Sequence, residues 1–533
     1  MSLRPLATGL GPRLVLGSSA LVVAAIVGAC STAGPSGFAN DGGPTGSGSG
    51  GGNDSSSGGP GAAGSGPMLG TDGGPAKPSV EGGIACPVGL TCNVSCAGGG
   101  TTTVTGKVYD PAGSNPLYNV AVYVPATPLV PLPKGVPTGA DSCSCGALFE
   151  SGALTNTTTA VDGTFTLTNV PVGGSVPLVI QVGKWRRQLS IKVTACQDNA
   201  QPDKSLAFPG TVPSTDTIDS MPDIAVSTGS ADTLECLLIR MGIASAEYVP
   251  GNSTAGHVHV FSGGDDGTGG TGGGAPEVPP MSGAPNSYKS LWDSQADMMP
   301  YDVVLLSCEG DETYNSNSAV LEQYLNAGGR AFGSHFHYAW FGGDLAGGEN
   351  VPAPPSDWGS NLADWGAQLS TSTTGAADVV ETLTGSTSPF PKGQELDQWL
   401  GVVGALGAES APAAEVPITP EDQDVGATNK AQAWLVDNGW TDYLSFNTPV
   451  DAPDAPDGGP PTYCGRAVFA DIHAAGDVTA ASAGDTNPPP TGCATGALSP
   501  QEKVLEFMLF DLSSCVLPDT VAPPVDAGLP NVQ

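Results

Sequence analysis

The chain has 533 residues, and its 17 Lys and Arg stand against 52 Asp and Glu, which gives a formal net charge of −35 at pH 7. A surface this negative repels phosphate backbones and anionic lipid headgroups, which argues against nucleic-acid binding and against electrostatic adhesion to membranes. Hydrophobic residues, at 39%, suffice for several packed cores, whereas 77 Gly and 49 Pro indicate long loops or linkers.

Residues 1–29 have the features of an export signal. Arg4 and Arg13 precede an apolar stretch over residues 14–29, which is too short to span a bilayer as a helix. The segment ends in residues 27–30, Val-Gly-Ala-Cys, and this ending resembles the lipobox of bacterial lipoproteins. The resemblance implies a lipoprotein signal peptide over 1–29 and membrane-anchoring acyl chains on Cys30. A secretory signal with an unrelated Cys is the alternative.

A linker and a tail flank the folded part. Residues 30–83 are dominated by Gly and Ser, so they lack the apolar surface that would offset the entropy of ordering, and we expect a disordered tether. Residues 518–533 are expected to form a disordered tail. Because Ser and not Asp follows Cys30, the resemblance to Gram-negative lipoproteins implies an outer-membrane or cell-surface location.

Eleven cysteines follow Cys30, six before residue 200 and five after it. In an exported protein, disulfide bonding is the default role of such cysteines. The first six can form three bridges whose connectivity the sequence leaves open, and the last five leave one thiol unpaired. We expect Cys464 and Cys493 to pair across the loop between them.

Residues 84–220, with cysteine-rich flanks, are predicted to form a β-sandwich. Alternating apolar and polar residues, separated by turn signals, predict strands over 103–109, 120–124, 164–167 and 178–182. The segments Gly106-x-Val108-x-Asp110, Asp162-Gly163-x-Phe165 and Val170-Pro171-x-Gly173 resemble the carboxypeptidase regulatory-like domain. That resemblance implies a transthyretin-like, seven-stranded sandwich without catalytic residues, which serves as a support or binding module.

Residues 221–517 are predicted to form an α/β domain, because near-continuous apolar runs alternate with amphipathic patterns. The strands are expected over 223–227, 303–306, 331–337 and 467–473, and the helices over 234–241, 318–327 and from 500 onward. Strands that alternate with helices predict a doubly wound, mainly parallel sheet.

Three segments of this region carry a second resemblance: residues 301–306, residues 321–335 with Gly328-Gly329-Arg330, and residues 465–473. They are similar to the class I glutamine amidotransferase-like fold, and within it to the ThuA-like branch. An insertion near 342–430 interrupts the match. A glutaminase of this fold needs a Cys on a strand-to-helix elbow flanked by Gly, whereas residues 334–338 read Ser-His-Phe-His-Tyr. The resemblance therefore implies a scaffold without glutaminase chemistry.

All five histidines of the chain lie in this region: His257, His259, His335, His337 and His473. The spacings His257-x-His259 and His335-x-His337 would place each pair on one face of a strand. The last three histidines end predicted strands, and open α/β sheets bind ligands at the carboxyl ends of strands. We therefore expect the histidines to converge in one crevice, with His335, His337 and His473 as candidate catalytic residues.

The same three imidazoles are candidate ligands for a divalent metal, zinc above all. Neutral imidazole binds such ions, and a carboxylate would come from Glu309, Asp311, Glu312 or Asp471. The bound ion would activate a water molecule for hydrolysis. Metal-free acid-base or binding chemistry is a second interpretation, and histidines that only form hydrogen bonds at strand ends are the third.

Two nucleophile candidates stand near these histidines. Cys308 directly follows a predicted buried strand and would need a lowered pKa to react, but an exported thiol more often forms a disulfide, which we expect here. Ser334, a further catalytic candidate, precedes His335. Because adjacent strand residues point to opposite faces, a Ser-His mechanism would have to use His337 or His473.

Tryptophans and one acid are the ligand-binding candidates. Trp185 lies in the basic cluster over 184–187, and its ring either stacks on a sugar or packs at a sheet edge. Trp340, Trp358 and Trp365 near the insertion either stack on sugars or fill a core or a lid. Glu309 is the acidic candidate.

These features predict a lipid-anchored protein of the cell envelope. The first hypothesis is a binding module for carbohydrate or cell-wall-derived ligands, including peptidoglycan, on a degenerate amidotransferase-like scaffold. The second is a metal- or His-dependent hydrolase that acts on a sugar derivative. The third is a structural surface protein without catalysis.

Overall fold

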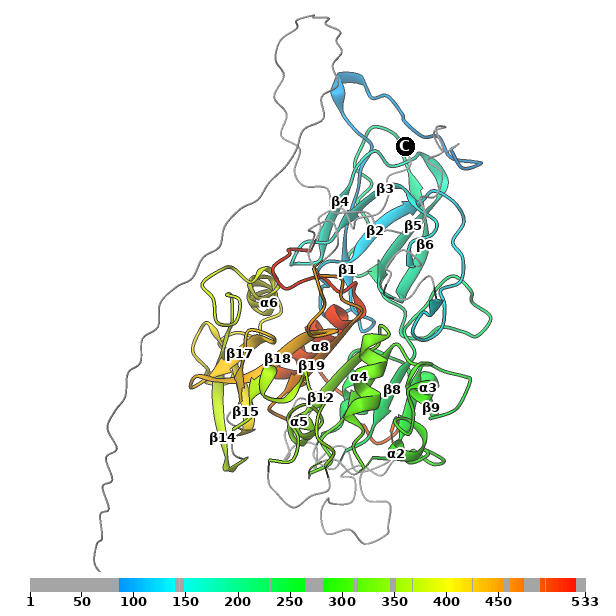
Figure 1. Ribbon diagram of the computed structural model, residues 1–533. Helices are drawn as coiled ribbons and strands as arrows, with labels where there is room; N and C mark the ends of the chain where they lie inside the picture. The colour runs from blue at the N-terminus through cyan, green and yellow to red at the C-terminus, as the bar shows by residue number, and fades with distance from the viewer. Residues whose placement is uncertain are drawn as a thin grey trace, which may run out of the picture. The chain divides into compact units, whose positions relative to one another are not determined.

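The computed structural model describes residues 86–139, 143, 148–229, 232–263, 281–310, 312, 315–345, 351–366, 368–423, 425–454, 461–473, 489–493 and 495–523 (Figure 1). The expected signal peptide, Cys30 and the tether over 30–83 lie outside the described residues, as do Asp311 and residues 524–533. Within the described ranges, no helix combines the length and the apolar character that crossing a bilayer requires.

The segment predicted to be a β-sandwich forms two sheets, in the orders β4-β1-β7 and β3-β2-β5-β6. In β4, Phe165 and Leu167 are buried while the two threonines that alternate with them are exposed. These side chains share one apolar cluster with Val122 and Ile180 of the other sheet. The strands are β1 Val104–Tyr109, β2 Ala121–Pro125, β3 Ala153–Thr158, β4 Thr164–Leu167, β5 Gly173–Val182, β6 Trp185–Val193 and β7 Leu206–Ala207.

A ten-stranded sheet dominates the remainder, in the order β15-β14-β17-β18-β19-β12-β11-β8-β10-β9. Its strands are β8 Ile224–Ser227, β9 Tyr248–Pro250, β10 Val258–Phe261, β11 Val303–Leu306, β12 Arg330–Ser334, β14 Gln368–Val379, β15 Glu415–Gln423, β17 Gln432–Asp437, β18 Trp440–Thr448 and β19 Gly465–Ala470. A separate pair consists of β13 Ala363–Asp364 and β16 Gly426–Ala427.

The large sheet is mixed, so the expectation of a mainly parallel sheet holds for one half only. Every pairing from β19 to β9 is parallel, and every pairing from β15 to β19 is antiparallel. The antiparallel strands come from residues 368–448, which overlap the predicted insertion near 342–430. Because β18 pairs with β19 along all six residues of β19, this segment extends the sheet and satisfies the backbone groups of an otherwise open edge.

Helices cover both faces of this sheet. Alternate residues of β11 enter two cores: Val303 and Leu305 join side chains of α1, α6 and α8, whereas Val304 and Leu306 join side chains of α2 to α5. This is the burial expected for a parallel strand covered on both faces. The helices are α1 Leu234–Arg240, α2 Ser287–Ser290, α3 Gln295–Met298, α4 Ser318–Asn326, α5 Tyr338–Gly342, α6 Pro391–Val402 and α8 Pro500–Ser513. Short 3-10 helices are η1 Ala97–Gly99, η4 Ser245–Glu247, η5 His335–His337, η6 Gly359–Asn361 and η7 Ala408–Ser410.

Helix α8 begins at the predicted capping box and packs against both the large sheet and the sandwich. Ser499 N donates to Glu502 Oε2 (2.7 Å), and Glu502 N donates to Ser499 Oγ (3.3 Å). On the sandwich side, the Phe510 ring lies against Trp185 at 5.6 Å between ring centroids. Trp185 is therefore buried, which contradicts its assignment as a ligand-binding residue and agrees with the packing interpretation.

Two carboxyl groups meet where α8 contacts the sandwich. Glu506 is fully buried, its Oε2 accepts a hydrogen bond from Asn115 Nδ2 (2.6 Å), and Asp110 interacts with it directly. Burial, and then the charge of Asp110, raises the pKa of Glu506 well above its ordinary value. Burial also raises the pKa of Asp110.

We predict that Glu506→Gln raises the free energy of unfolding at pH 7 by about 1–3 kcal/mol, because it removes the cost of burying a carboxyl that is ionised in the unfolded chain. Folding raises the pKa of this carboxyl, so the carboxyl lowers stability at every pH above its pKa in the unfolded chain and has no such effect below it. The stability gained by Glu506→Gln should therefore shrink as the pH falls towards 4. Urea unfolding at both pH values measures this, with Glu150→Gln at an exposed position as the control. A variant that is less stable than wild type at pH 7 would contradict the prediction.

Four disulfides join described cysteines: Cys86–Cys92, Cys96–Cys196, Cys143–Cys464 and Cys236–Cys493. Cys515 is disulfide-bonded as well. The expected bridge between Cys464 and Cys493 is wrong. Cys464 immediately precedes β19, whereas Cys493 bonds to the first turn of α1, which follows the carboxyl end of β8. A six-residue strand is roughly 20 Å long, so the two thiols lie at opposite edges of the sheet and beyond bonding distance.

We predict that non-reducing peptide mapping recovers Cys143 linked to Cys464. Replacing both with Ser should lower the free energy of unfolding by about 2–5 kcal/mol, because this bridge spans 321 residues. The matched control is the double Ser replacement of Cys86 and Cys92, which are six residues apart and should matter less. Recovery of a Cys464–Cys493 peptide would refute this connectivity.

Candidate functional site

Three reactive side chains follow three neighbouring strands of the large sheet. Cys308 comes two residues after β11, His335 directly after β12, and His473 three residues after β19. The three strands are parallel, with β12 in the middle. Their carboxyl ends therefore share one edge of the sheet, which is where open α/β sheets bind ligands.

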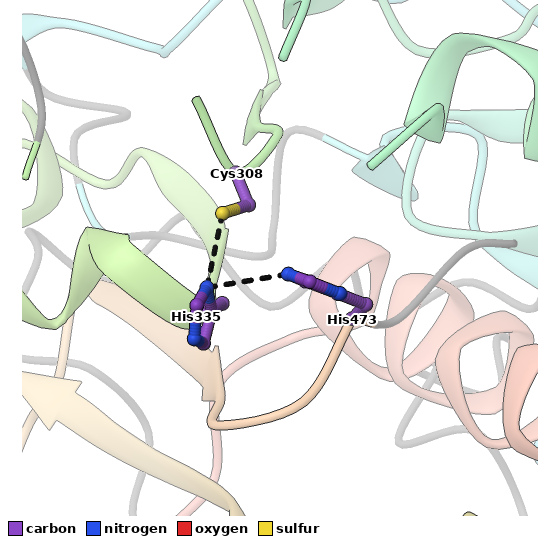
Figure 2. A group of neighbouring side chains, drawn as sticks. All are labelled: Cys308, His335 and His473. Atoms are coloured by element: carbon purple, nitrogen blue, oxygen red, sulfur yellow. Dashed lines mark hydrogen bonds between the residues drawn. The ribbon is translucent and has the colours of Figure 1, made fainter. Parts of the chain in front are cut away.

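The three side chains touch one another (Figure 2). His335 Nδ1 lies 3.2 Å from Cys308 Sγ and 3.2 Å from His473 Nε2. One donor atom from each residue lies within 4.8 Å of the others. The exposed fractions are 0% for Cys308, 2% for His335 and 7% for His473. We call these three residues the carboxyl-edge centre.

His335 occupies a sharp turn between a strand and a helix. Its φ of 48° is in the left-handed region, which a residue with a side chain rarely adopts. The strand predicted to run to residue 337 ends at Ser334, and η5 begins at His335. Because the backbone changes direction here, the two-residue repeat of a strand does not apply to His335 and His337.

His337 is consequently not part of the centre, which corrects its assignment as a catalytic and metal-binding residue. Its ring is fully buried and stacks on Trp340 at 6.3 Å, and its Nδ1 lies 3.2 Å from Ser334 O. Burial lowers the pKa of His337 to about 3. It is a neutral core imidazole.

His257 and His259 lie at the opposite edge of the sheet, at the amino end of β10. His257 Nδ1 contacts Glu247 Oε2 at 2.6 Å, and His259 Nε2 lies 3.6 Å from Asp223 Oδ1. The expectation that five histidines converge in one crevice is therefore wrong. Two of them, His335 and His473, meet at the carboxyl edge, and Cys308 joins them.

Ser334 supports the centre through its hydrogen bonds. Its Oγ donates to the Asp232 carboxylate and accepts from Cys308 N at 3.1 Å. A hydroxyl whose proton is directed to Asp232 is not aligned with an imidazole base, so Ser334 acts as a positioning residue and not as the expected nucleophile. No motif in the sequence marks Asp232, and its place after β8, the strand beside β11, is the one local signal for it.

Cys308 is a free thiol, so the expected disulfide is wrong. Its complete burial is the physical reason, because no second cysteine can reach it without opening the core. Sγ accepts a hydrogen bond from Gly310 N at 3.4 Å and another from the backbone of Phe336. Burial, reinforced by the charge of Asp232, raises the pKa of Cys308. At neutral pH the thiol is therefore protonated and a poor nucleophile.

The remaining candidates are buried outside the carboxyl-edge centre. Trp340 is fully buried with its ring 5.1 Å from that of Trp292, so it fills a core and does not present a face for a sugar. Trp358 and Trp365 belong to the same apolar cluster. Glu309, Glu312 and Asp471 are buried acids that do not belong to the three-residue cluster.

No protein-family model and no curated protein matches this chain. Among solved structures, the exo-beta-1,4-mannosidase Op5Man5 from Opitutaceae bacterium strain TAV5 is similar over 49% of this chain and 32% of its own chain. The identity is 9% and the TM-score is 0.20. The match covers about a third of the mannosidase, and a similarity this low supports no inference about fold or activity.

We predict that Cys308 resists iodoacetamide in the native protein at pH 7.5 and reacts after unfolding in urea. The thiol is buried and its pKa is raised, and alkylation needs an accessible thiolate. Intact-mass measurement before and after unfolding, followed by peptide mapping, checks this without a mutation. Rapid native alkylation at Cys308 would show that the thiol is exposed or ionised.

Proposed function

We propose that this chain is an exported, lipid-anchored protein of the cell envelope whose α/β domain is a hydrolase. The domain is taken to be a class I amidotransferase-like scaffold of the ThuA-like branch, beside a transthyretin-like sandwich that acts as its support. The carboxyl-edge centre carries the proposal: imidazoles from two chain segments and a thiol from a third meet where such sheets bind ligands. The disulfides support an exported protein.

The centre favours attack by water over attack by a thiol. Because the pKa of Cys308 is raised, its thiol holds its proton at neutral pH. His335 and His473 offer ring nitrogens that can take a proton from a water molecule and return one to a leaving group. The segment that matches the cysteine elbow of a glutaminase, residues 334–338, contains no Cys, and His335 sits on its left-handed turn. Glutamine hydrolysis is therefore not the proposed reaction.

The proposed substrate is a sugar derivative, as the resemblance to the ThuA-like branch suggests. The chain also contains a groove of about 550 Å³ at the opposite edge of the sheet, where Asn447 pairs with Arg466 at the amino end of β19. Its size suits a small ligand, but it lies away from the carboxyl-edge centre and so is not the place where that centre would act. Its lining includes Asn429 and Tyr463, whose amide and hydroxyl groups can both donate and accept hydrogen bonds. Gln432 and Asn447 also line it, but their amides bond to Thr382, Leu517 and Arg466 within the protein. Sugars present the same mixture of donors and acceptors.

The same groove favours a second candidate function, a binding module for carbohydrate or peptidoglycan-derived ligands without catalysis. The groove offers polar groups to a ligand, whereas the tryptophans first considered as ligand-binding residues, Trp185 and Trp340, are buried in cores. The two functions differ in a measurable way, since the binding module needs the groove and not the carboxyl-edge centre.

We predict that the full exported chain, purified in detergent, hydrolyses at least one substrate in a panel of O-acetylated sugars, N-acetylated sugars, aryl glycosides and peptidoglycan fragments. His473→Gln should lower kcat/KM by about 100-fold or more, because it removes a proton-transfer group. His259→Gln, at the opposite edge of the sheet, is the matched control and should leave the rate unchanged. Glycan binding without hydrolysis would favour the binding module, and an active His473→Gln variant would refute the assigned centre.

A further inference from the structure

We infer that Cys308, His335 and His473 bind one zinc ion through the thiolate and the two imidazoles. Binding of the ion is argued from the residues of the centre themselves, whereas its role in hydrolysis rests on the function proposed above. The sequence predicted His335, His337 and His473 as the metal ligands. In the structure Cys308, and not His337, lies beside the other two.

The donor atoms have the separations of a metal site. Zinc binds thiolate at about 2.3 Å and imidazole at about 2.0–2.1 Å, so neighbouring donors of a tetrahedral site are roughly 3.3–3.6 Å apart. Here the two measured donor separations are both 3.2 Å, and all three donors fall within 4.8 Å. A single ion can therefore contact all three with small side-chain movements.

The hydrogen-bonding capacity of His335 also favours an ion. Its Nδ1 faces two partners at the same distance, Cys308 Sγ and His473 Nε2. A neutral imidazole nitrogen has one lone pair or one proton, so it can make one good hydrogen bond in the ring plane and not two. An ion at the centre of the three donors would use one lone pair from each residue.

The surroundings of the cysteine suit a bound thiolate. Backbone N–H groups of Gly310 and Phe336 point to Sγ and would stabilise negative charge on it. Gln501 Nε2 donates to the carbonyl oxygen of His473, and Ser334 holds the backbone of Cys308. These contacts fix the direction of the ligands, as second-layer partners do in metal sites.

The electrostatic field at the centre attracts a cation. Asp232 and Glu309 act on Cys308 as neighbouring negative charges. An arriving zinc ion would displace the thiol proton, which leaves to solvent, and the resulting Zn–S bond neutralises part of this charge. The same bond accounts for a free cysteine in an exported chain whose other described cysteines are in disulfides.

The ligand set indicates zinc and a catalytic type of site. Thiolate and imidazole together suit zinc better than magnesium or calcium, which prefer oxygen ligands. Three protein ligands leave one of four tetrahedral positions for water, the arrangement typical of catalytic zinc. A zinc-bound water ionises near neutral pH, so in the zinc form the ion would activate the water, and the ligating ring nitrogens of His335 and His473 would no longer take its proton.

The test uses the full chain stripped with a chelator and reloaded with zinc or with cobalt(II) alone. We expect one tightly bound ion per chain, a thiolate-to-cobalt charge-transfer absorption band, and X-ray absorption from the zinc form that reports one sulfur and two nitrogen ligands. Cys308→Ser should abolish the band, and His473→Gln should weaken metal affinity at least tenfold. His257→Gln, which alters the His257–Glu247 pair at the opposite edge, is the matched control and should change neither.

The X-ray absorption measurement uses wild-type protein, so it decides the question even if a variant does not fold. An all-oxygen coordination shell would mean binding to surface carboxylates and would overturn the inference, as would a chain that binds no ion. Hydrolysis that persists in metal-free protein would overturn the metal's role and keep the proposed function. A sulfur-ligated ion in a protein without any hydrolytic activity would uphold the site and reject the function.

Discussion

Backbone hydrogen bonds between β12 and its two parallel neighbours, β11 and β19, determine where the reactive side chains lie. Cys308 and His335 are 27 residues apart in the chain, and His335 and His473 are 138 residues apart. Parallel pairing places the carboxyl ends of the three strands at one edge, and the left-handed turn at His335 directs its ring towards the other two residues. A shift of one strand by one residue would exchange its two faces and break up the cluster.

The second organising feature is α8, which contributes to a core shared by the sandwich and the large sheet. Phe507 stacks on Tyr118, and Phe510 lies against Trp185, while neighbouring side chains of the helix join the cluster that contains the sheet. Gln501, in the first turn of α8, donates to the His473 carbonyl. Helix α8 thus contacts both the sandwich and His473. A change in how the sandwich packs against α8 would therefore alter the position of His473 in the carboxyl-edge centre.

Two buried cations, Lys392 and Arg466, form ion pairs away from the carboxyl-edge centre. Lys392 contacts Asp511 at 2.5 Å, and Arg466 contacts Asp519 at 3.0 Å, each within the packed interior. With 17 basic residues against 52 acidic ones, the chain as a whole is strongly negative. Both the long-range charge and the nearby Asp232 and Glu309 favour a positively charged ligand over an anionic one.

The sequence by itself determined the elements whose signals are local. The strand over 164–167, the buried strand over 303–306 and the capping box at Ser499 follow from side-chain period and backbone capping, which act within a few residues. Only the tertiary structure decided which histidines meet, because a turn of the backbone after Ser334 sends His337 into the core and leaves His335 at the edge. Disulfide partners and the free state of Cys308 were likewise set by burial and by distance across the sheet, and these depend on strand order, which no local pattern encodes.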